Sequence, residues 1–252
     1  IDKNGGLAAS YVKNIMIIVT EIINFSIDEG YSSPIRIKLH MPKNEKGEIR
    51  VMDKINQKTL EDYLFSHLTP TNMGILLSLN TGLRIGEICA LKWSDIDFQK
   101  AILKVNSTVS RVKSDDENSS KSKLIIDTPK TQSSIREIPI ISQLMKPLIF
   151  LYETRNSEYI ISAETSFVSP RTFEYRFHTV LEKCRISPFN YHVLRHTFAT
   201  RCIEGGVDIK SLSEILGHAN VSVTLNTYVH SSIERKRELL EKISENTTES
   251  HK

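Results

Sequence analysis

The sequence predicts a mainly helical α+β protein that contains one small antiparallel sheet of three strands. Two observations carry this prediction. Over most of the chain, apolar residues recur every three or four positions, which is the period of helices that bury one face. Between residues 101 and 140 they instead alternate with polar residues, as they do in half-buried strands. A length of 252 residues allows one or two domains.

The first predicted helix spans residues 7–29 and ends at Gly30, because glycine readily adopts the left-handed turn that closes a helix. Its apolar stripe is wide for a helix that stands alone, and the sequence begins with Ile rather than Met. We therefore expect partner helices to precede it in a longer protein. Residues 32–50 have the composition of a linker, which predicts two units, residues 1–45 and residues 46–252.

The elements of the second unit follow from the same two periods. Further helices are predicted at residues 60–68, 73–79, 85–91, 143–155, 171–184, 192–204 and 209–216. Strands of a single sheet are predicted at residues 101–109, 124–126 and 135–140, with Lys130 at the turn before the last strand. A final charged helix carries an apolar stripe of Ile233, Leu240 and Ile243.

Composition excludes several classes of protein. No run approaches the roughly 18 apolar residues of a membrane-spanning helix. The net charge of +3 is too small for a histone-like protein or a polybasic tail. The three cysteines are scattered, with neither disulfide-framework nor zinc-ribbon spacing, and there is no signal peptide. We therefore expect a cytoplasmic protein that makes no contact with a membrane.

Two stretches of the chain are locally basic. One is the linker, and the other is residues 171–201, where six Lys or Arg stand against two Glu. Such surfaces suit phosphate groups, although a charged run is also typical of an ordinary solvated face. The candidate phosphate contacts are Arg36, Lys38, Lys43, Lys46, Arg171 and Arg176.

The block from His192 to His196 carries the most chemistry for its length. The two histidines have the i, i+4 spacing of zinc metalloprotease helices, but Val193 stands where such helices need a glutamate base. His192 and Arg195 share one helix face. An arginine that grips a phosphate beside a histidine that handles a proton suits phosphoryl transfer. Taken alone, the pattern is more typical of a salt-bridged surface turn.

Two further motifs change that balance. The segment from Thr81 to Glu87 places Arg84 after a glycine turn at the start of a helix, where free backbone N–H groups favour an anion. His218 follows a predicted helix stop, and Tyr228 comes ten residues later.

In this order, the three motifs resemble the tyrosine recombinases, the phage-integrase family, over residues 52–243. Integrases of conjugative transposons and temperate phages are the most similar members. The resemblance implies a recombinase catalytic domain in residues 46–252. It also implies that residues 1–45 end a helical core-binding domain and that the last helix docks into a neighbouring protomer.

The resemblance implies an active site that cleaves DNA. Arg84 and Arg195 would bind the non-bridging oxygens of the scissile phosphate, a task that suits the two-pronged, permanently charged guanidinium. Tyr228 would attack phosphorus and leave a 3′-phosphotyrosine and a free 5′-hydroxyl. The two arginines would neutralise the charge of the phosphate, and the phosphotyrosine ester would store the energy of the broken bond. The resemblance therefore implies that neither a metal nor ATP is needed.

Three further residues receive roles by the same resemblance. Lys130, on a β-hairpin, would protonate the 5′-oxygen leaving group, with Lys121 and Lys123 as rivals on a looser loop. His192 would accept or orient a proton near the tyrosine. His218 would donate a hydrogen bond to the phosphate.

Supporting roles fall to the neighbours of these residues. Glu87 would orient Arg84, although a plain carboxylate at a helix N-terminus explains it nearly as well. His196 is expected to be structural. The valines around Ser222 alternate like a strand, but the family places the tyrosine on a short helix, so we expect a helix capped by Ser222.

The resemblance thus implies a site-specific recombinase that moves a mobile element into or out of DNA. Its partners would be double-stranded DNA at element ends and target sites, and further copies of itself, from dimer to tetramer. The alternatives are a type IB topoisomerase, which shares the chemistry, and a DNA-binding relative that has lost catalysis. A metal-dependent nuclease is disfavoured because the sequence has no carboxylate cluster for Mg²⁺.

Overall fold

The computed structural model describes residues 7–33, 50–113, 122–128 and 132–228. The chain divides into two compact units, residues 1–48 and 49–252. The first unit contains helix α1 (Ala9–Asp28), and Gly30 follows it with a φ of +74°. Many of its apolar side chains, Ile22 and Phe25 among them, are more than half exposed. The assignment of this unit to a core-binding domain stays a prediction.

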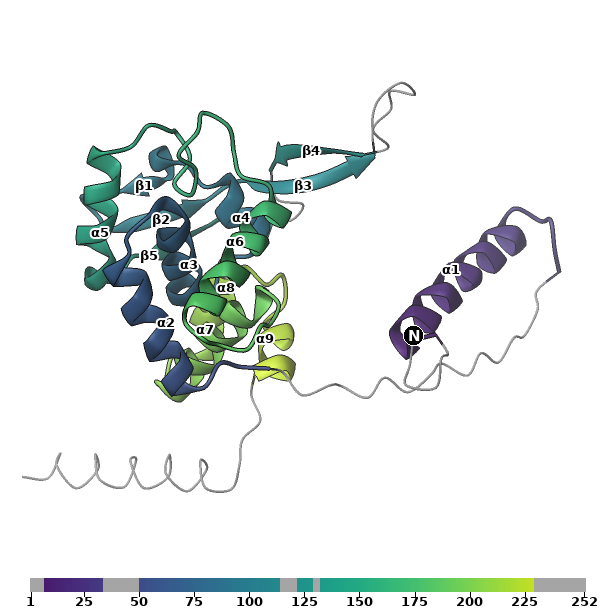
Figure 1. Cartoon of the computed structure of the whole chain (residues 1–252). Coiled ribbons are helices and arrows are strands. Elements are labelled where there is room, and N and C mark those ends of the chain that lie inside the picture. The colour runs from purple at the N-terminus through teal and green to yellow at the C-terminus, as the bar shows by residue number, and fades with distance from the viewer. Residues whose placement is uncertain (1–6, 34–49, 114–121, 129–131, 229–252) are drawn as a thin grey trace, which may run out of the picture. The chain divides into compact units, whose positions relative to one another are not determined.

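The second unit consists mostly of helices, with two small antiparallel sheets (Figure 1). Its helices are α2 (Lys54–Ser66), α3 (Pro70–Thr81), α4 (Ile85–Ala90), α5 (Ser142–Glu153), α6 (Pro170–Lys183), α7 (His192–Glu204), α8 (Ile209–Leu216) and α9 (Val221–Tyr228). Its strands are β1 (Ile96–Asp97), β2 (Ile102–Val105), β3 (Thr108–Lys113), β4 (Ser122–Asp127) and β5 (Arg136–Pro139). Short 3₁₀ turns lie at Trp93–Asp95 and Gln132–Ser134.

Polar caps explain why two of these helices start earlier than the apolar pattern predicts. The side chain of Asp53 accepts the backbone N–H of Asn56, so α2 begins at residue 54 rather than 60. Thr69 caps α3 in the same way, and Pro70 occupies the first helical position, which needs no N–H donor. Periodicity reports only the buried face, whereas the caps fix the ends.

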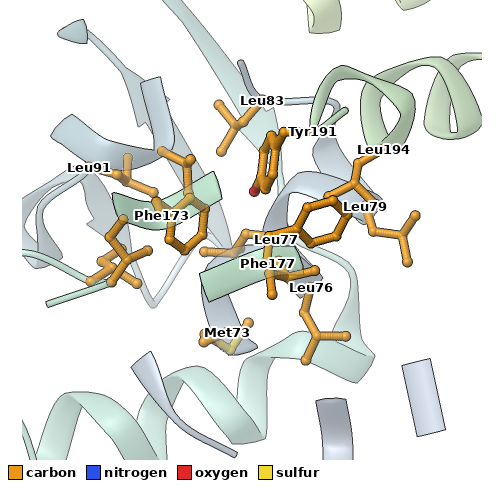
Figure 2. Packing of buried hydrophobic residues seen from close by; sticks show 14 of the residues in the cluster. Met73, Leu76, Leu77, Leu79, Leu83, Leu91, Phe173, Phe177, Tyr191 and Leu194 are labelled. Carbon is orange, nitrogen blue, oxygen red and sulfur yellow. The ribbon is translucent and has the colours of Figure 1, made fainter. Parts of the chain in front are cut away.

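The core is built around α3, which is buried on nearly every side, and Figure 2 shows its large apolar side chains among other buried residues. Met73, Leu76, Leu77 and Leu79 are all fully buried. They belong to one apolar cluster with residues of α2, α4, α5, α6 and α7. Because α3 is held by the core on nearly every side, its C-terminal end, where the turn to Arg84 begins, is fixed in place.

The predicted grouping of the strands is wrong in one respect. Residues 101–109 form two strands in different sheets, because the chain turns away at Asn106, whose side chain donates to Asp95. The three-stranded sheet has the order β1-β2-β5, with Val105 opposite Arg136. Strands β3 and β4 form a separate hairpin, which extends away from the helices in Figure 1. Alternation continues through the break, so the pattern alone does not reveal it.

Helices α7, α8 and α9 share a second, smaller cluster. Ala199, Leu212 and Leu216 form its buried part, and Tyr228 packs against it. The expected cap of α9 is wrong by two residues. Asn220 accepts the backbone N–H of Ser222, which itself lies inside the helix. Asn is as good a cap as Ser, so the sequence offers both.

Within the described residues, no helix is both long enough and apolar enough to span a membrane.

Candidate active site

Five of the six predicted catalytic residues lie in described segments, and they come from four different elements. Arg84 is the N-cap of α4, and His192 and Arg195 occupy the first turn of α7. His218 follows the end of α8, and Tyr228 is the last residue of α9. The sixth, Lys130, lies outside the described residues.

Arg195 is the centre of the cluster. Its side chain is almost fully buried, with 2% exposed. One nitrogen, Nη1, donates to the carbonyl of Gly82 at 2.8 Å, and Nη2 donates to the carbonyl of Leu216 at 2.8 Å. Burial and then the charge of Arg84 lower its pKa to about 9, so it remains charged at neutral pH. A buried cation without a carboxylate bonded to it is a strong site for an anion.

Gly82 makes this arrangement sterically feasible. It ends α3 with a φ of +67°, in the left-handed region that suits glycine. A Cβ there would lie 2.7 Å from side-chain atoms of both Leu216 and Phe198. The turn that leads to Arg84 therefore packs directly on α7 and α8.

Arg84 is held by Glu87, as the sequence predicts. Its Nη1 donates to Glu87 at 2.8 Å, and its backbone N–H donates to the other carboxylate oxygen at 2.9 Å. Glu87 thus both orients the arginine and caps the helix, so the two interpretations of this residue hold together. The Arg84 side chain is 36% exposed and has donors left for a ligand.

Arg136, the first residue of β5, belongs to the site although no motif in the sequence predicts it. Its side chain, only 6% exposed, donates from Nη1 and Nη2 to both oxygens of Glu87, at 3.1 and 2.9 Å. Burial alone would raise the pKa of Glu87, but the bonds and charges of Arg136 and Arg84 bring it below its ordinary 4.5. Because Arg136 neutralises Glu87, Arg84 keeps its charge available. The position of Arg136 just after the turn predicted at Lys130 was the only feature of the sequence that could have pointed to it.

The C-terminal end of α8 anchors all three arginines. The carbonyl of Ile215 accepts from Arg136, that of Leu216 from Arg195, and that of Gly217 from Arg84. The last carbonyls of a helix lack partners within it and lie at the negative end of its dipole. A guanidinium group donates hydrogen bonds to these carbonyls and also brings the positive charge that the negative end of the dipole attracts. The end of α8 therefore holds the three guanidinium groups close together.

His218 lies against the same guanidinium. Its Nε2 is 2.8 Å from Nη2 of Arg195, and its Nδ1 is 2.7 Å from the hydroxyl of Thr224, which is fully buried. Burial and the nearby arginines lower its pKa to about 4. A neutral imidazole accepts from Arg195 at Nε2 and donates from Nδ1 to Thr224.

Tyr228 meets a different histidine from the one expected. Its hydroxyl is 2.8 Å from Nδ1 of His196, a residue expected to be structural. The His192 ring packs edge-on against His196, with centroids 4.6 Å apart. Burial, His196 and the two arginines lower the pKa of His192 to about 4. No local pattern predicts the contact between His196 and Tyr228, because the two residues lie 32 positions apart in the sequence.

The two predicted phosphate contacts that the structure describes, Arg171 and Arg176, line two different hollows. Arg171 lines a hollow of about 700 Å³ together with His192, Gly86 and residues of the β3–β4 hairpin. Arg176, on the same helix, lines a different and smaller hollow of about 320 Å³. Arg36, Lys38, Lys43 and Lys46 lie outside the described residues.

The cluster is therefore built for an anion. Two guanidinium groups, those of Arg84 and Arg136, share one carboxylate, the third, that of Arg195, is buried without one, and the neighbouring histidines are kept neutral. Among the residues that the structure describes, no group of three His, Cys, Asp or Glu is placed to hold a metal. An anion clamp beside a phenol is an arrangement suited to phosphoryl transfer.

Comparison with known proteins agrees with this geometry. Residues 45–235 match the phage integrase family. A tyrosine recombinase XerC-like protein of Caldanaerobacter subterraneus is 31% identical over 95% of this chain and 67% of that protein. The transposase of transposon Tn916 from Enterococcus faecalis is 29% identical over 64% of this chain and 42% of that protein.

Among solved structures, the Tn1549 transposon integrase in complex with transposon right-end DNA has a TM-score of 0.77. It is 21% identical, and the match covers 96% of this chain and 82% of that one. The fold is thus that of a tyrosine recombinase. The chain belongs to the phage integrase family, the tyrosine-type site-specific DNA recombinases.

Proposed function

We propose that this chain cleaves and rejoins DNA strands through a covalent bond between Tyr228 and a 3′-phosphate. One observation carries the proposal. Arg195 and Arg84 donate to the successive carbonyls of Leu216 and Gly217, and the Tyr228 hydroxyl lies 2.8 Å from Nδ1 of His196, the residue that follows Arg195 in α7. The charges of both arginines oppose the rise in the Tyr228 pKa that burial causes. A nucleophile and two phosphate-binding cations therefore converge, although they come from three different elements.

The two arginines have distinct tasks. Arg84, half-exposed and held by Glu87, binds a non-bridging oxygen as DNA arrives. Arg195, buried and fixed by two carbonyls, stabilises the charge that grows on the phosphorane. Arg136 neutralises Glu87, so that the carboxylate does not cancel the clamp.

The bond changes balance without an external energy source. The phenolic oxygen bonds to phosphorus as the bond from phosphorus to the 5′-oxygen breaks, and the 5′-oxygen takes a proton, for which we propose Lys130. His192 and His218 border the phosphate. The 3′-phosphotyrosine keeps the energy of the original ester, so a 5′-hydroxyl of another strand reverses the step. ATP is not required, and arginine charge serves where other enzymes use a metal.

The proposed substrate is double-stranded DNA at the ends and target sites of a mobile element. Two likenesses support it. The Tn1549 integrase structure holds transposon end DNA, and a lambda integrase structure of TM-score 0.62 is a tetramer on a Holliday junction. We propose the same partners here, namely DNA and further copies of the chain, with arginine and lysine side chains of the linker and α6 on the phosphates. Such a substrate would place the protein in the bacterial cytoplasm.

The direct test is a covalent adduct. The protein is incubated with DNA that carries candidate element ends and a nick near the cut, in EDTA, and the reaction is quenched with SDS. We expect a slower-migrating band that is absent with Tyr228→Phe. An equal band with Tyr228→Phe would contradict the choice of nucleophile, and loss of the band in EDTA would contradict metal-independent cleavage.

Strand exchange separates a recombinase from a topoisomerase. Two duplexes of different length, each with an end sequence, are mixed with the protein. A recombinase yields joined products of new length. A protein that only relaxes supercoiled plasmid, with no product of new length, acts as a topoisomerase.

A further inference from the structure

We propose that His196 accepts the phenolic proton of Tyr228 during cleavage and returns it during rejoining. This inference rests on the proposed function, because it takes Tyr228 as the nucleophile. It assigns catalysis to the second histidine of the His192–His196 block.

The geometry places His196 on the reacting atom. Its Nδ1 lies 2.8 Å from the Tyr228 hydroxyl, with the two ring centroids 5.6 Å apart. No hydrogen bond joins His192 to Tyr228 in the described part of the chain, and its ring instead packs against the ring of His196. A base must be within hydrogen-bond reach of the proton that it removes, and His196 meets that condition in the resting structure.

The surroundings of the pair keep His196 neutral and able to accept a proton, while burial raises the pKa of Tyr228 against the opposing charges of Arg195 and Arg84. Burial, and then the charge of Arg195, lower the pKa of His196, so the ring is neutral at pH 7 and has one nitrogen free to accept. With the proton on Nε2, that nitrogen is Nδ1. The same Arg195 charge favours the phenolate of Tyr228. Among the described residues, His192 on α7 and Tyr228 on α9 are the titratable groups whose rings contact that of His196.

The geometry of α7 explains how the neighbouring residues Arg195 and His196 act on different groups, the phosphate and Tyr228. Arg195 points to the carbonyls at the ends of α3 and α8, whereas His196, one residue and about 100° further round the helix, faces α9. The phosphate clamp and the base are therefore adjacent in sequence and held by a single rigid element.

The step balances as a proton transfer coupled to substitution. The proton passes from the phenolic oxygen to Nδ1, the oxygen bonds to phosphorus, and the electrons of the broken phosphorus–oxygen bond remain on the 5′-oxygen, which is protonated in turn. In rejoining, protonated His196 returns its proton to the departing phenolic oxygen.

Two substitutions test the proposal. His196→Leu removes the acceptor. His196→Asn keeps an acceptor oxygen close to the position of Nδ1 but cannot take a proton. His67→Leu, at an exposed histidine directly after α2, is the matched control. The rate of adduct formation is measured in single turnover from pH 6 to 9, and DNA binding is measured by gel shift for each protein.

We expect the control to react at the wild-type rate and His196→Leu to react about 100-fold or more slowly at pH 7. His196→Asn binds DNA normally but stays slow at pH 7, and its rate rises steeply with pH as solvent takes over the proton. A structural role would leave the shape of the pH profile unchanged.

The proposal is overturned if His196→Asn reacts at the wild-type rate at pH 7, or if both variants are slow with wild-type pH profiles. Either result leaves the proposed function intact, provided that Tyr228→Phe forms no adduct. An adduct with Tyr228→Phe would instead contradict the proposed function itself.

Discussion

The two sides of the active site are held in different ways. On the arginine side, three successive carbonyls at the end of α8 each accept from one guanidinium group, and the buried carboxylate of Glu87 holds two of the three, those of Arg84 and Arg136. On the tyrosine side, Tyr228 ends a helix of eight residues in which Thr224 alone is buried. That helix packs on a small cluster rather than on the main core.

This difference indicates which part of the chemistry is preorganised. Cations that must stabilise a transition state act best when they do not have to move, and their anchors supply that rigidity. Tyr228, the proposed nucleophile, depends on few contacts, chiefly His196 and the packing of α9. Control of cleavage by partners would therefore act more easily on the tyrosine side.

The largest expected effect concerns the rigid side. Arg195→Lys keeps a positive charge but cannot reach both carbonyls and the phosphate, because an ammonium group has no fork. We expect adduct formation to fall about a thousandfold in single turnover. Arg155→Lys, at an exposed residue beyond α5, is the control. A loss of less than tenfold for Arg195→Lys would show that the clamp does not need its fixed geometry.

Arg136→Met tests the anchoring of Glu87. It leaves a buried carboxylate with Arg84 as its remaining cation, so the free energy of unfolding should fall by about 3 kcal/mol at pH 7. Adding Glu87→Gln should restore most of that loss. The control is Glu137, which also lies on β5 and forms an exposed ion pair with Lys104 of β2. Glu137→Gln should change the free energy of unfolding by less than about 0.5 kcal/mol. Denaturant unfolding measures all four proteins.

The pH dependence of the same variant follows from Glu87. Because its folded pKa lies below 4.5, this group stabilises wild type above that pH, and the contribution is lost as pH falls through the folded value. Without Arg136, burial raises the pKa, so acid relieves the penalty. The stability gap between wild type and variant should therefore narrow from pH 8 to pH 5. A gap that widens on acidification would contradict this.

Gly82→Ala tests the turn between α3 and Arg84. The left-handed backbone and two contacts of 2.7 Å should together destabilise the protein by about 2 kcal/mol, measured by thermal unfolding. Gly206→Ala, with a φ of +84° and nothing within 4 Å of the new Cβ, is the control for backbone strain alone and should cost about 1 kcal/mol. Equal losses would mean that the turn does not pack as described.

The smallest effect is expected on the tyrosine side. Thr224→Val keeps the buried volume of Thr224 but removes the hydroxyl bonded to His218. One such bond contributes about 1 kcal/mol, so we expect a fivefold to tenfold slower adduct formation with little change in melting temperature. A large loss of stability would mean that α9 is anchored more firmly than its contacts indicate.

The sequence predicted the helical elements well and the contacts among them less well. The bounds of α7 and α8 follow from periodicity and glycine stops, and Arg84, Glu87 and Arg195 lie together as expected. Arg136 and the His196–Tyr228 contact were missed. Both depend on residues brought together by tertiary packing, and no local pattern marks such pairs. The separation of the β3–β4 hairpin was missed for the same reason.

The central claim is that Tyr228 forms the covalent bond to DNA, and peptide mapping of the adduct tests it most directly. After nuclease and trypsin digestion, mass spectrometry locates the residual nucleotide. Residues 211–235 form one tryptic peptide with a single tyrosine, Tyr228, and residues 186–195 form another whose single tyrosine is Tyr191. We predict the nucleotide on the first peptide. A nucleotide on the second, or on any other peptide, would contradict the account.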